Sequence, residues 1–206
     1  MGWYEEQLLP RVVNRACASK GLVSWRRRAA AGLTGRVVEV GFGSGLNLDY
    51  LPRAVEEVLA VDPATVAYRL AADRIARSSP PIKSVGLDGQ AIALDDESCD
   101  SVLATFTLCT VPDADLVLRE IRRILRPGGS FHFLEHGLAP ESGVARWQRR
   151  LDPIQQRLAG GCHLSRDPLA LIQASGLDVE WCDQGYAKGP KPWTYLSVGV
   201  ATKLRG

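Results

Sequence analysis

The stretch Val37-Val38-Glu39-Val40-Gly41-Phe42-Gly43-Ser44-Gly45-Leu46-Asn47 decides the fold of this chain. Its first residues are apolar and β-branched, as in a strand that is covered on both faces. The three glycines that follow allow the backbone to turn sharply and to lie close to a ligand, because no Cβ intervenes. In open α/β sheets, ligands bind at the carboxyl ends of parallel strands. The stretch therefore predicts a strand, a glycine turn and the start of a helix, with a nucleotide-like cofactor at the turn.

The spacing of the glycines departs from the dinucleotide fingerprint Gly-x-Gly-x-x-Gly, because the third glycine stands at Gly45 and is followed by Leu46. Glu39 also precedes the first glycine, and a carboxylate sits poorly beside a pyrophosphate. It suits a ligand with an ammonium group. S-adenosylmethionine (SAM) has an adenosine, no phosphates and a cationic amino-acid tail. On the turn alone, a SAM site and a tight turn without a ligand are equally good interpretations.

Two further acidic residues follow the next two predicted strands. Asp62 comes directly after the strand at 57–61, and Asp88 after the strand at 82–87. In nucleotide-binding βαβ units, the acid after the second strand accepts hydrogen bonds from ribose hydroxyls. A helix cap and a turn are the alternatives for Asp62 and Asp88. However, Glu39, Asp62 and Asp88 together match three parts of one ligand. In that order they match the amine tail, the ribose and the base.

Length and composition indicate one soluble globular domain with a full-sized core. The chain has 206 residues, of which 46% are hydrophobic and 23% charged. The formal charge of +2 does not favour a general nucleic-acid binder. Basic residues gather before Val37, and a solvated helix face is preferred there over an anion-binding surface.

The cysteine pattern and the absence of long apolar runs favour a cytoplasmic protein. The five cysteines are an odd number without Cys-x-x-Cys spacing, which predicts neither a disulfide framework nor a metal site. No apolar run reaches the ~20 residues of a transmembrane helix. The segment Met1 to Glu6 lacks the basic and apolar regions of a signal peptide.

The rest of the chain predicts alternating strands and helices in a single domain over 1–206. Further strands are expected at 100–106, 130–134, 177–181 and 195–201. Helices are expected at 8–17, at 45–51, after Pro63, from Ala114 to Leu125, and in two pieces between 138 and 176. We divide the domain into a helical N-terminal cap (1–35), a cofactor-binding half (36–136) and a substrate-side part with the last two strands (137–206).

Over about residues 36–203, the chain resembles the class I SAM-dependent methyltransferases of the methyltransferase type 11 superfamily. The resemblance rests on Glu39 to Gly45, Asp62-Pro63, Asp88-Gly89 and Leu125-Arg126-Pro127-Gly128-Gly129. It implies an α/β fold with a Rossmann-like, seven-stranded, mostly parallel sheet, an antiparallel last strand and helices on both faces. It also implies SAM as the cofactor and S-adenosylhomocysteine as the product. The cofactor contacts that it implies come from Glu39, Gly41, Phe42, Gly43, Gly45 and Asn47 at the methionine end, Asp62 and Pro63 at the ribose, Asp88, Gly89 and Gln90 at the adenine, and Thr105 and Leu108 beside the sulfonium.

Four other segments are similar to the membrane-associated alkyl-thiol S-methyltransferases. They are Leu108 to Val111, Phe133 to His136, Leu151-Asp152-Pro153 and Gly161 to Arg166. The chain departs from that group in lacking an apolar N-terminal anchor. It also looks somewhat like the quinone and phospholipid methyltransferases, which share the core.

The expected function is methyl transfer from SAM to a small, lipophilic acceptor, with a thiol as the first choice. A quinone or phospholipid methyltransferase and a SAM-binding regulatory protein without catalysis are the alternatives. Nucleic acid is not expected as a partner, because no Asn-Pro-Pro-Tyr-type motif follows the fourth strand. Peripheral contact with a membrane surface is left open.

Methylation of a thiol requires loss of its proton, because the thiolate is the nucleophile. Glu135 and His136 follow the fifth strand and are the predicted catalytic residues, with His163 as a looser candidate base. A structural histidine is the alternative for each imidazole. A thiol with a pKa of about 8.5 is partly ionised without a base. Trp3, Tyr4, His163 and Trp193 are the residues predicted to bind the acceptor.

Overall fold

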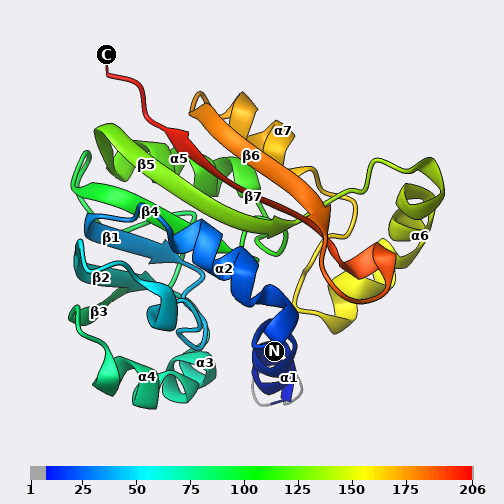
Figure 1. The fold of residues 1–206 in the computed structure, drawn as a ribbon, viewed down its shortest axis with the longest axis horizontal. Coiled ribbons are helices and arrows are strands. Elements are labelled where there is room, and N and C mark those ends of the chain that lie inside the picture. Colours follow the sequence, from blue (N-terminus) through cyan, green and yellow to red (C-terminus); the bar gives the residue numbers. More distant parts are fainter. Residues whose placement is uncertain (1–7, 206) are drawn as a thin grey trace.

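The computed structural model describes residues 8–205, and a seven-stranded sheet forms its centre (Figure 1). The strands lie in the order β3-β2-β1-β4-β5-β7-β6. β7 runs antiparallel to β5 and β6, and the other neighbouring pairs are parallel. The predicted sheet with an antiparallel last strand is therefore confirmed. The strands are β1 (Gly35–Val40), β2 (Val55–Val61), β3 (Ile82–Gly86), β4 (Cys99–Thr105), β5 (Leu125–His136), β6 (Asp178–Tyr186) and β7 (Tyr195–Thr202).

Helices cover both faces of the sheet, as predicted. α5 (Ala114–Ile124) and α7 (Pro168–Ala174) pack on one face, and α2 (Val23–Ala30) packs on the other (Figure 1). Successive side chains of a strand point to opposite faces. Within β1, Val38 and Val40 contact the α5 side, whereas Val37 contacts the α2 side. The same alternation directs Glu39 towards α2.

The remaining helices complete the fold around the sheet, and α3 (Thr65–Leu70) and α4 (Ala72–Arg77) contact Ala60 of β2 through Tyr68, Ala71 and Ile75. α1 (Leu9–Cys17) lies against the glycine turn, where Ser44 Oγ donates to Asn14 Oδ1 at 2.6 Å, and the N-terminal cap over residues 1–35 stays a prediction. Among residues 8–205, no helix has the length and apolar character needed to cross a membrane. The other helical elements are α6 (Ser142–Leu158) and the 3₁₀ turns η2 (Lys20–Leu22), η3 (Leu48–Tyr50) and η4 (Lys191–Trp193).

Several predicted boundaries were wrong. The helix expected at 45–51 is only the 3₁₀ turn η3, because Gly45 is left-handed and Leu51 is already extended before Pro52. β5 begins at Leu125 instead of residue 130, because the Pro-Gly-Gly turn pairs with the chain after β7. Gly128 N donates to the Lys203 carbonyl at 2.7 Å there. β6 continues to Tyr186, five residues beyond its predicted end at 181.

Candidate active site

The glycine turn after β1 is held closely by the loop that follows β4. Gly41, Gly43 and Gly45 have φ angles of 75°, 56° and 69°, in the left-handed region where a side chain would be strained. A Cβ at Gly41 would lie 2.1 Å from Thr107 Oγ1, which donates to the Val40 carbonyl at 2.9 Å. The glycines that were predicted to admit a ligand therefore also admit a neighbouring loop.

Asp62 lies beside the glycine turn, because β2 neighbours β1, whereas Asp88 follows β3, one strand further out. Asp62 Oδ2 accepts a hydrogen bond from Gly43 N at 2.7 Å, and its Oδ1 accepts one from Ala64 N at 2.7 Å. Burial raises the pKa of Asp62. Asp88 is exposed and accepts from the backbone N–H of Gln90 at 2.8 Å. Asp62 thus connects the glycine turn to the end of β2, besides bonding the chain that enters α3.

A buried polar network connects α2, β1 and β4. Arg26 Nη1 donates to Asn47 Oδ1 at 2.6 Å and to Thr105 Oγ1 at 3.3 Å. Asn47 Nδ2 donates to Glu39 Oε1 at 2.7 Å and to Thr105 Oγ1 at 3.0 Å. Arg26 also donates through Nη2 to the Cys17 carbonyl at 3.2 Å. The four side chains of this network are buried, and it contains one cation and one carboxylate.

Two polar atoms of this network lack a hydrogen-bond partner within the described chain. They are Arg26 Nε and Glu39 Oε2, and both are inaccessible to solvent. Burial raises the pKa of Glu39 to about 7, although the Asn47 hydrogen bond and the Arg26 charge lower it. Burial also lowers the pKa of Arg26. Unpaired buried polar atoms are costly, so this arrangement suits a ligand that supplies both a donor and an acceptor.

Arg26 was missed at the sequence level, where the basic run was interpreted as a solvated face. The helical spacing of α2 contains the signal that would have found it. Arg26 precedes Ala29 and Ala30 by three and four residues, and these alanines are fully buried against the sheet. Arg26 therefore lies on the inner face of α2, whereas Arg27 and Arg28 are exposed.

Glu135 is bonded to the loop after β4 through both of its carboxylate oxygens. Oε1 accepts from Thr107 N at 2.9 Å, and Oε2 accepts from Cys109 N at 3.0 Å. Burial raises the pKa of Glu135 to about 7, against the effect of these backbone hydrogen bonds. This bonding favours a positioning role over proton transfer, and the catalytic role of Glu135 stays a prediction.

His136 is buried at the end of β5 beside the loop that carries η4. Its Nε2 lies 3.2 Å from the Pro192 carbonyl, which also accepts from Gln148 Nε2 at 3.1 Å. Burial lowers the pKa of His136, so the imidazole is neutral at neutral pH. With Nε2 donating, Nδ1 is the basic nitrogen. Gln148, which the sequence did not single out, also accepts from Ala139 N at 2.9 Å and so fixes this corner.

Two residues that the resemblance placed at the cofactor direct their side chains into the core. The Leu108 side chain is fully buried in the cluster that includes α5. Phe42 packs on Tyr68, with ring centroids 5.7 Å apart, and on Ala60 and Ala71. Leu108 and Phe42 can therefore contact a cofactor only through their backbone atoms.

The loop between α6 and α7 is bonded to the loop after β4. Asp152 on α6 accepts from Leu164 N at 2.5 Å and from Ser165 Oγ at 2.8 Å. Arg166 donates to the carbonyls of Leu108 at 2.5 Å and Val111 at 2.8 Å. The separate sequence segments that resembled the alkyl-thiol enzymes are therefore brought together in space.

Of the four predicted acceptor residues, His163 and Trp193 lie near α6, and the other two lie outside the described chain. His163 N donates to the Cys109 carbonyl at 2.7 Å, and its half-buried ring lies 3.8 Å from Asp152 Oδ2. Trp193 is 43% exposed, and its Nε1 donates to Gln155 Oε1 at 3.1 Å. Trp3 and Tyr4 precede residue 8 and lie outside the described residues.

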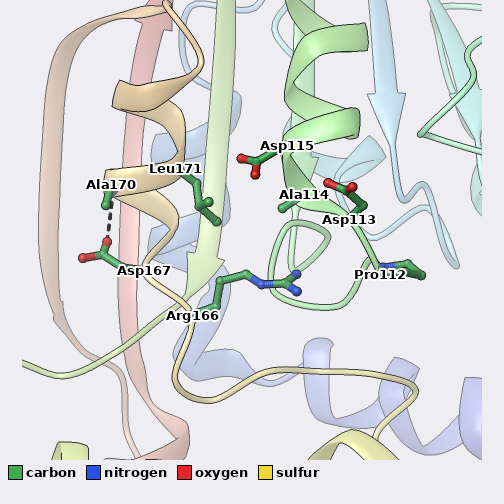
Figure 2. Close-up of a pocket in the computed structure, with 8 residues that line it drawn as sticks. All are labelled: Pro112, Asp113, Ala114, Asp115, Arg166, Asp167, Ala170 and Leu171. Atoms are coloured by element: carbon green, nitrogen blue, oxygen red, sulfur yellow. Dashed lines mark hydrogen bonds between the residues drawn. The ribbon is translucent and has the colours of Figure 1, made fainter.

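An open cavity of about 460 Å³ lies between the N-termini of α5 and α7 (Figure 2). Its walls include Asp113, Asp115, Arg166 and Asp167, and none of the predicted cofactor residues lines it. Asp113 and Asp167 cap these helices by accepting from Leu116 N and Ala170 N at 3.0 and 3.1 Å. The cavity is therefore distinct from the glycine-turn site.

Comparisons with known proteins agree with this arrangement. A family model described as a methyltransferase domain matches residues 38–133. Thiol S-methyltransferase TMT1B of Rattus norvegicus is 32% identical and aligns with 79% of this chain and 66% of its own length. The human TMT1B is 31% identical over 84% of this chain and 71% of its own length. Demethylmenaquinone methyltransferase of Roseiflexus castenholzii is 31% identical over 76% and 72% of the two chains.

The solved structures show the same fold. A SAM-dependent methyltransferase structure from Methanosarcina mazei has a TM-score of 0.65 at 20% identity, covering 83% of this chain and 93% of its own. The chain belongs to the class I SAM-dependent methyltransferases. Within that class it is similar over most of its length to the thiol S-methyltransferases, and it spans 66% of the rat TMT1B and 58% of the human TMT1A.

The raised pKa of Glu39 predicts how stability depends on pH. In the unfolded chain the carboxyl ionises near 4.5, whereas the folded protein holds the proton up to about 7. Between these values the folded state binds more protons, so the free energy of unfolding falls as pH rises. The contribution of Glu39 to this fall is roughly 3 kcal/mol. We expect Glu39→Gln to make the fall between pH 4.5 and 7 shallower in urea unfolding experiments without ligand.

Glu57→Gln is the control, because two cationic partners, Lys83 and Arg36, lower the pKa of Glu57. The stabilisation by Glu57 is present above its unfolded pKa and is lost at lower pH, so its removal cannot flatten the fall. Equal slopes for wild type and Glu39→Gln would contradict the raised pKa of the buried Glu39 carboxyl.

Proposed function

We propose that this protein transfers the methyl group of SAM to a small, lipophilic acceptor, with a thiol as the acceptor. The observation that carries the cofactor assignment is the buried Arg26–Asn47–Glu39 network beside the glycine turn. The free Glu39 Oε2 is an acceptor for an ammonium group, and the free Arg26 Nε is a donor for a carboxylate. The amino-acid tail of SAM carries both of these groups.

The neighbouring strand ends supply groups for the rest of the cofactor. Each carboxylate oxygen of Asp62 accepts one backbone N–H and retains a lone pair for a ribose hydroxyl. Asp88 is exposed at the end of β3, where it can accept from an adenine amine. Bound SAM supplies an electrophilic methyl group on a sulfonium, so the protein has no covalent chemistry of its own to perform.

The chain's own residues orient the acceptor and manage its proton. Glu135 holds the loop Thr107 to Cys109 at the carboxyl edge of the sheet, and Asp152 holds the loop before α7. A thiol is ionised enough to react near its ordinary pKa of about 8.5. His136 is the candidate to take the proton from an acceptor, because its imidazole is neutral and lies at this edge. Similarity to the TMT1 thiol S-methyltransferases supports the choice of a thiol.

A quinol or phospholipid acceptor is the second candidate. The demethylmenaquinone methyltransferase has the same 31% identity as the human TMT1B, over 76% of this chain instead of 84%. A protein that binds SAM without catalysis is the third.

Five cysteines without a disulfide support a reducing compartment such as the cytoplasm.

We also propose that α6 rests on an anionic membrane surface. Trp147, Ile154 and Leu158 are more than half exposed on this helix. The exposed residues around them include Arg146, Arg149, Arg150 and Arg157, and the only acid within α6, Asp152, is buried. An apolar stripe flanked by arginines is typical of helices that lie in the membrane interface. A lipophilic acceptor would be concentrated at such a surface.

The cofactor assignment predicts that Arg26→Ala weakens SAM binding by about 10- to 100-fold, the loss expected for one charge-assisted hydrogen bond. Isothermal calorimetry with SAM measures the affinity, and circular dichroism checks that the variant is folded. Arg27→Ala, an exposed neighbour on the same helix, is the matched control and should bind SAM normally. Asp62→Ala should lose SAM binding as well. Wild-type affinity in both Arg26→Ala and Asp62→Ala would remove the site from this edge of the sheet.

The acceptor class is tested with SAM labelled in its methyl group and a panel of a thiol, a phenol and an amine that carry the same alkyl chain. We expect the thiol to be methylated fastest. In the same assay, His136→Ala should lower kcat about 100-fold with little change in SAM affinity, as expected for a lost general base. His132→Ala is the control, because His132 is also buried but is bonded to Ala29 and Ser130 on the α2 face.

Two results of the panel would overturn the thiol assignment. A phenol that is preferred over the thiol would favour the quinone-type reaction. SAM binding by calorimetry without methyl transfer to any acceptor would favour the binding protein.

The membrane assignment predicts that the protein sediments with phosphatidylserine-containing vesicles at low salt and less at high salt. The double variant Trp147→Ser and Ile154→Ser should lose most of this binding. Trp181→Ser, which removes an exposed tryptophan from β6, is the control. Equal sedimentation of the two variants would show that α6 is not the contact surface.

A further inference from the structure

Two thiols from distant parts of the chain meet beside the candidate acceptor region. Cys109 lies in the loop after β4, and Cys162 lies in the loop between α6 and α7. Their sulfur atoms are 3.9 Å apart. Neither residue has a role in the cofactor site or in the proposed proton transfer, and both thiols are free.

The backbone around the two cysteines fixes this approach. His163 N donates to the Cys109 carbonyl at 2.7 Å. Gly161 is left-handed, with φ of 89°, and a Cβ there would lie 2.9 Å from the Thr110 carbonyl oxygen. Glycine therefore allows the two loops to touch directly. The sulfur atoms need to approach by about 2 Å to form a disulfide bond of ~2.05 Å.

The two thiols differ in access and in acidity. Cys109 is fully buried, whereas Cys162 is half-buried. Hydrogen bonding with the Cys109 thiol lowers the pKa of Cys162, and the same contact together with burial raises the pKa of Cys109. Because thiolates are the attacking species in disulfide exchange, Cys162 has the features of the attacking thiol and Cys109 those of the resolving thiol.

We propose that Cys162 and Cys109 form a thiol–disulfide exchange site for small disulfides. The Cys162 thiolate attacks one sulfur of R–S–S–R, so that a bond between Cys162 and RS forms and the other RS⁻ leaves and takes up a proton. Cys109 then gives up its proton and attacks the Cys162 sulfur. The Cys109–Cys162 disulfide forms, and the second RSH leaves. Two protein thiols are oxidised, and one small disulfide is reduced to two thiols.

This site goes beyond the proposed methyl transfer, because the exchange uses neither SAM nor His136. The two activities are nevertheless related in chemistry, since oxidation of a thiol acceptor produces a disulfide of this class. Where the proposed function holds, exchange at Cys162 would return two acceptor thiols beside the methyl-transfer site.

The experiment uses the reduced full-length protein and bis(2-hydroxyethyl) disulfide as the probe. The reaction is stopped with iodoacetamide at timed intervals, and the intact mass and non-reduced peptides are measured. We expect the wild type to lose two free thiols without keeping an adduct, and the peptides containing Cys109 and Cys162 to be joined. Dithiothreitol should reverse the change.

Variants separate the two roles. Cys109→Ala should keep the mixed disulfide on Cys162, because no resolving thiol remains. Cys162→Ala leaves only Cys109 at this site. Its reaction with the disulfide probe should be at least about tenfold slower than that of wild-type Cys162, because Cys109 is buried. Cys182→Ala is the matched control, since Cys182 is half-buried like Cys162 but burial raises its pKa. It should behave as the wild type.

Three outcomes would overturn the proposal. They are an unreactive Cys162, an adduct that persists on wild-type Cys162, and a disulfide that joins Cys162 to Cys17. The wild-type peptide analysis decides among them even if a variant fails to fold. Because no SAM or methyl acceptor is present, failure here leaves the methyltransferase assignment untouched, and failure of that assignment leaves this result standing.

Discussion

The burial of Glu39 is the constraint on which the cofactor edge of the structure depends. β1 is the third strand of seven and is covered on both faces, so a carboxylate within it has no access to water. Burying an isolated charge is very costly unless a partner accompanies it. The chain meets this need with Asn47 and, one hydrogen bond further, with Arg26 from α2. One Glu39 oxygen and the Arg26 Nε stay without a hydrogen-bond partner. This arrangement destabilises the ligand-free protein and favours the binding of a zwitterionic ligand.

The loops proposed to hold the acceptor are organised mainly by side chains that bond to backbone. Glu135 accepts from two N–H groups of the loop after β4, Asp152 accepts from the loop before α7, and Arg166 donates to two carbonyls of the first loop. Side chain to backbone bonds fix loops whose own sequence has no regular structure. These hydrogen bonds bring Cys109 and Cys162 together and place His136 and His163 near the same edge, although the four residues come from three separate segments of the chain.

Much of the fold and part of the site could be predicted from the sequence because they depend on local patterns. The apolar runs were enough to predict the separate strands, and the resemblance to the methyltransferases implied that they form one seven-stranded sheet with an antiparallel last strand. The acids after successive strands could be assigned to one edge, because parallel neighbours end on the same side. The role of Glu135 was harder to predict, since a carboxylate at a strand end looks the same whether it holds a loop or transfers a proton. Its two backbone partners at Thr107 and Cys109 became visible only in the folded chain.

The sequence by itself determined the class of the protein, the position of the glycine turn and the acids at the strand ends, because these depend on glycine conformation and strand order. Only the tertiary structure decided that Arg26 is linked to Glu39 through Asn47, that Leu108 and Phe42 turn into the core, and that Cys162 lies against Cys109. These facts depend on contacts between residues far apart in the chain, such as Cys109 and Cys162. Spacing along a sequence carries no information about such contacts until packing brings the segments together. The glycine turn is therefore a local feature of the sequence, whereas the buried Arg26–Asn47–Glu39 network beside it is a property of the fold.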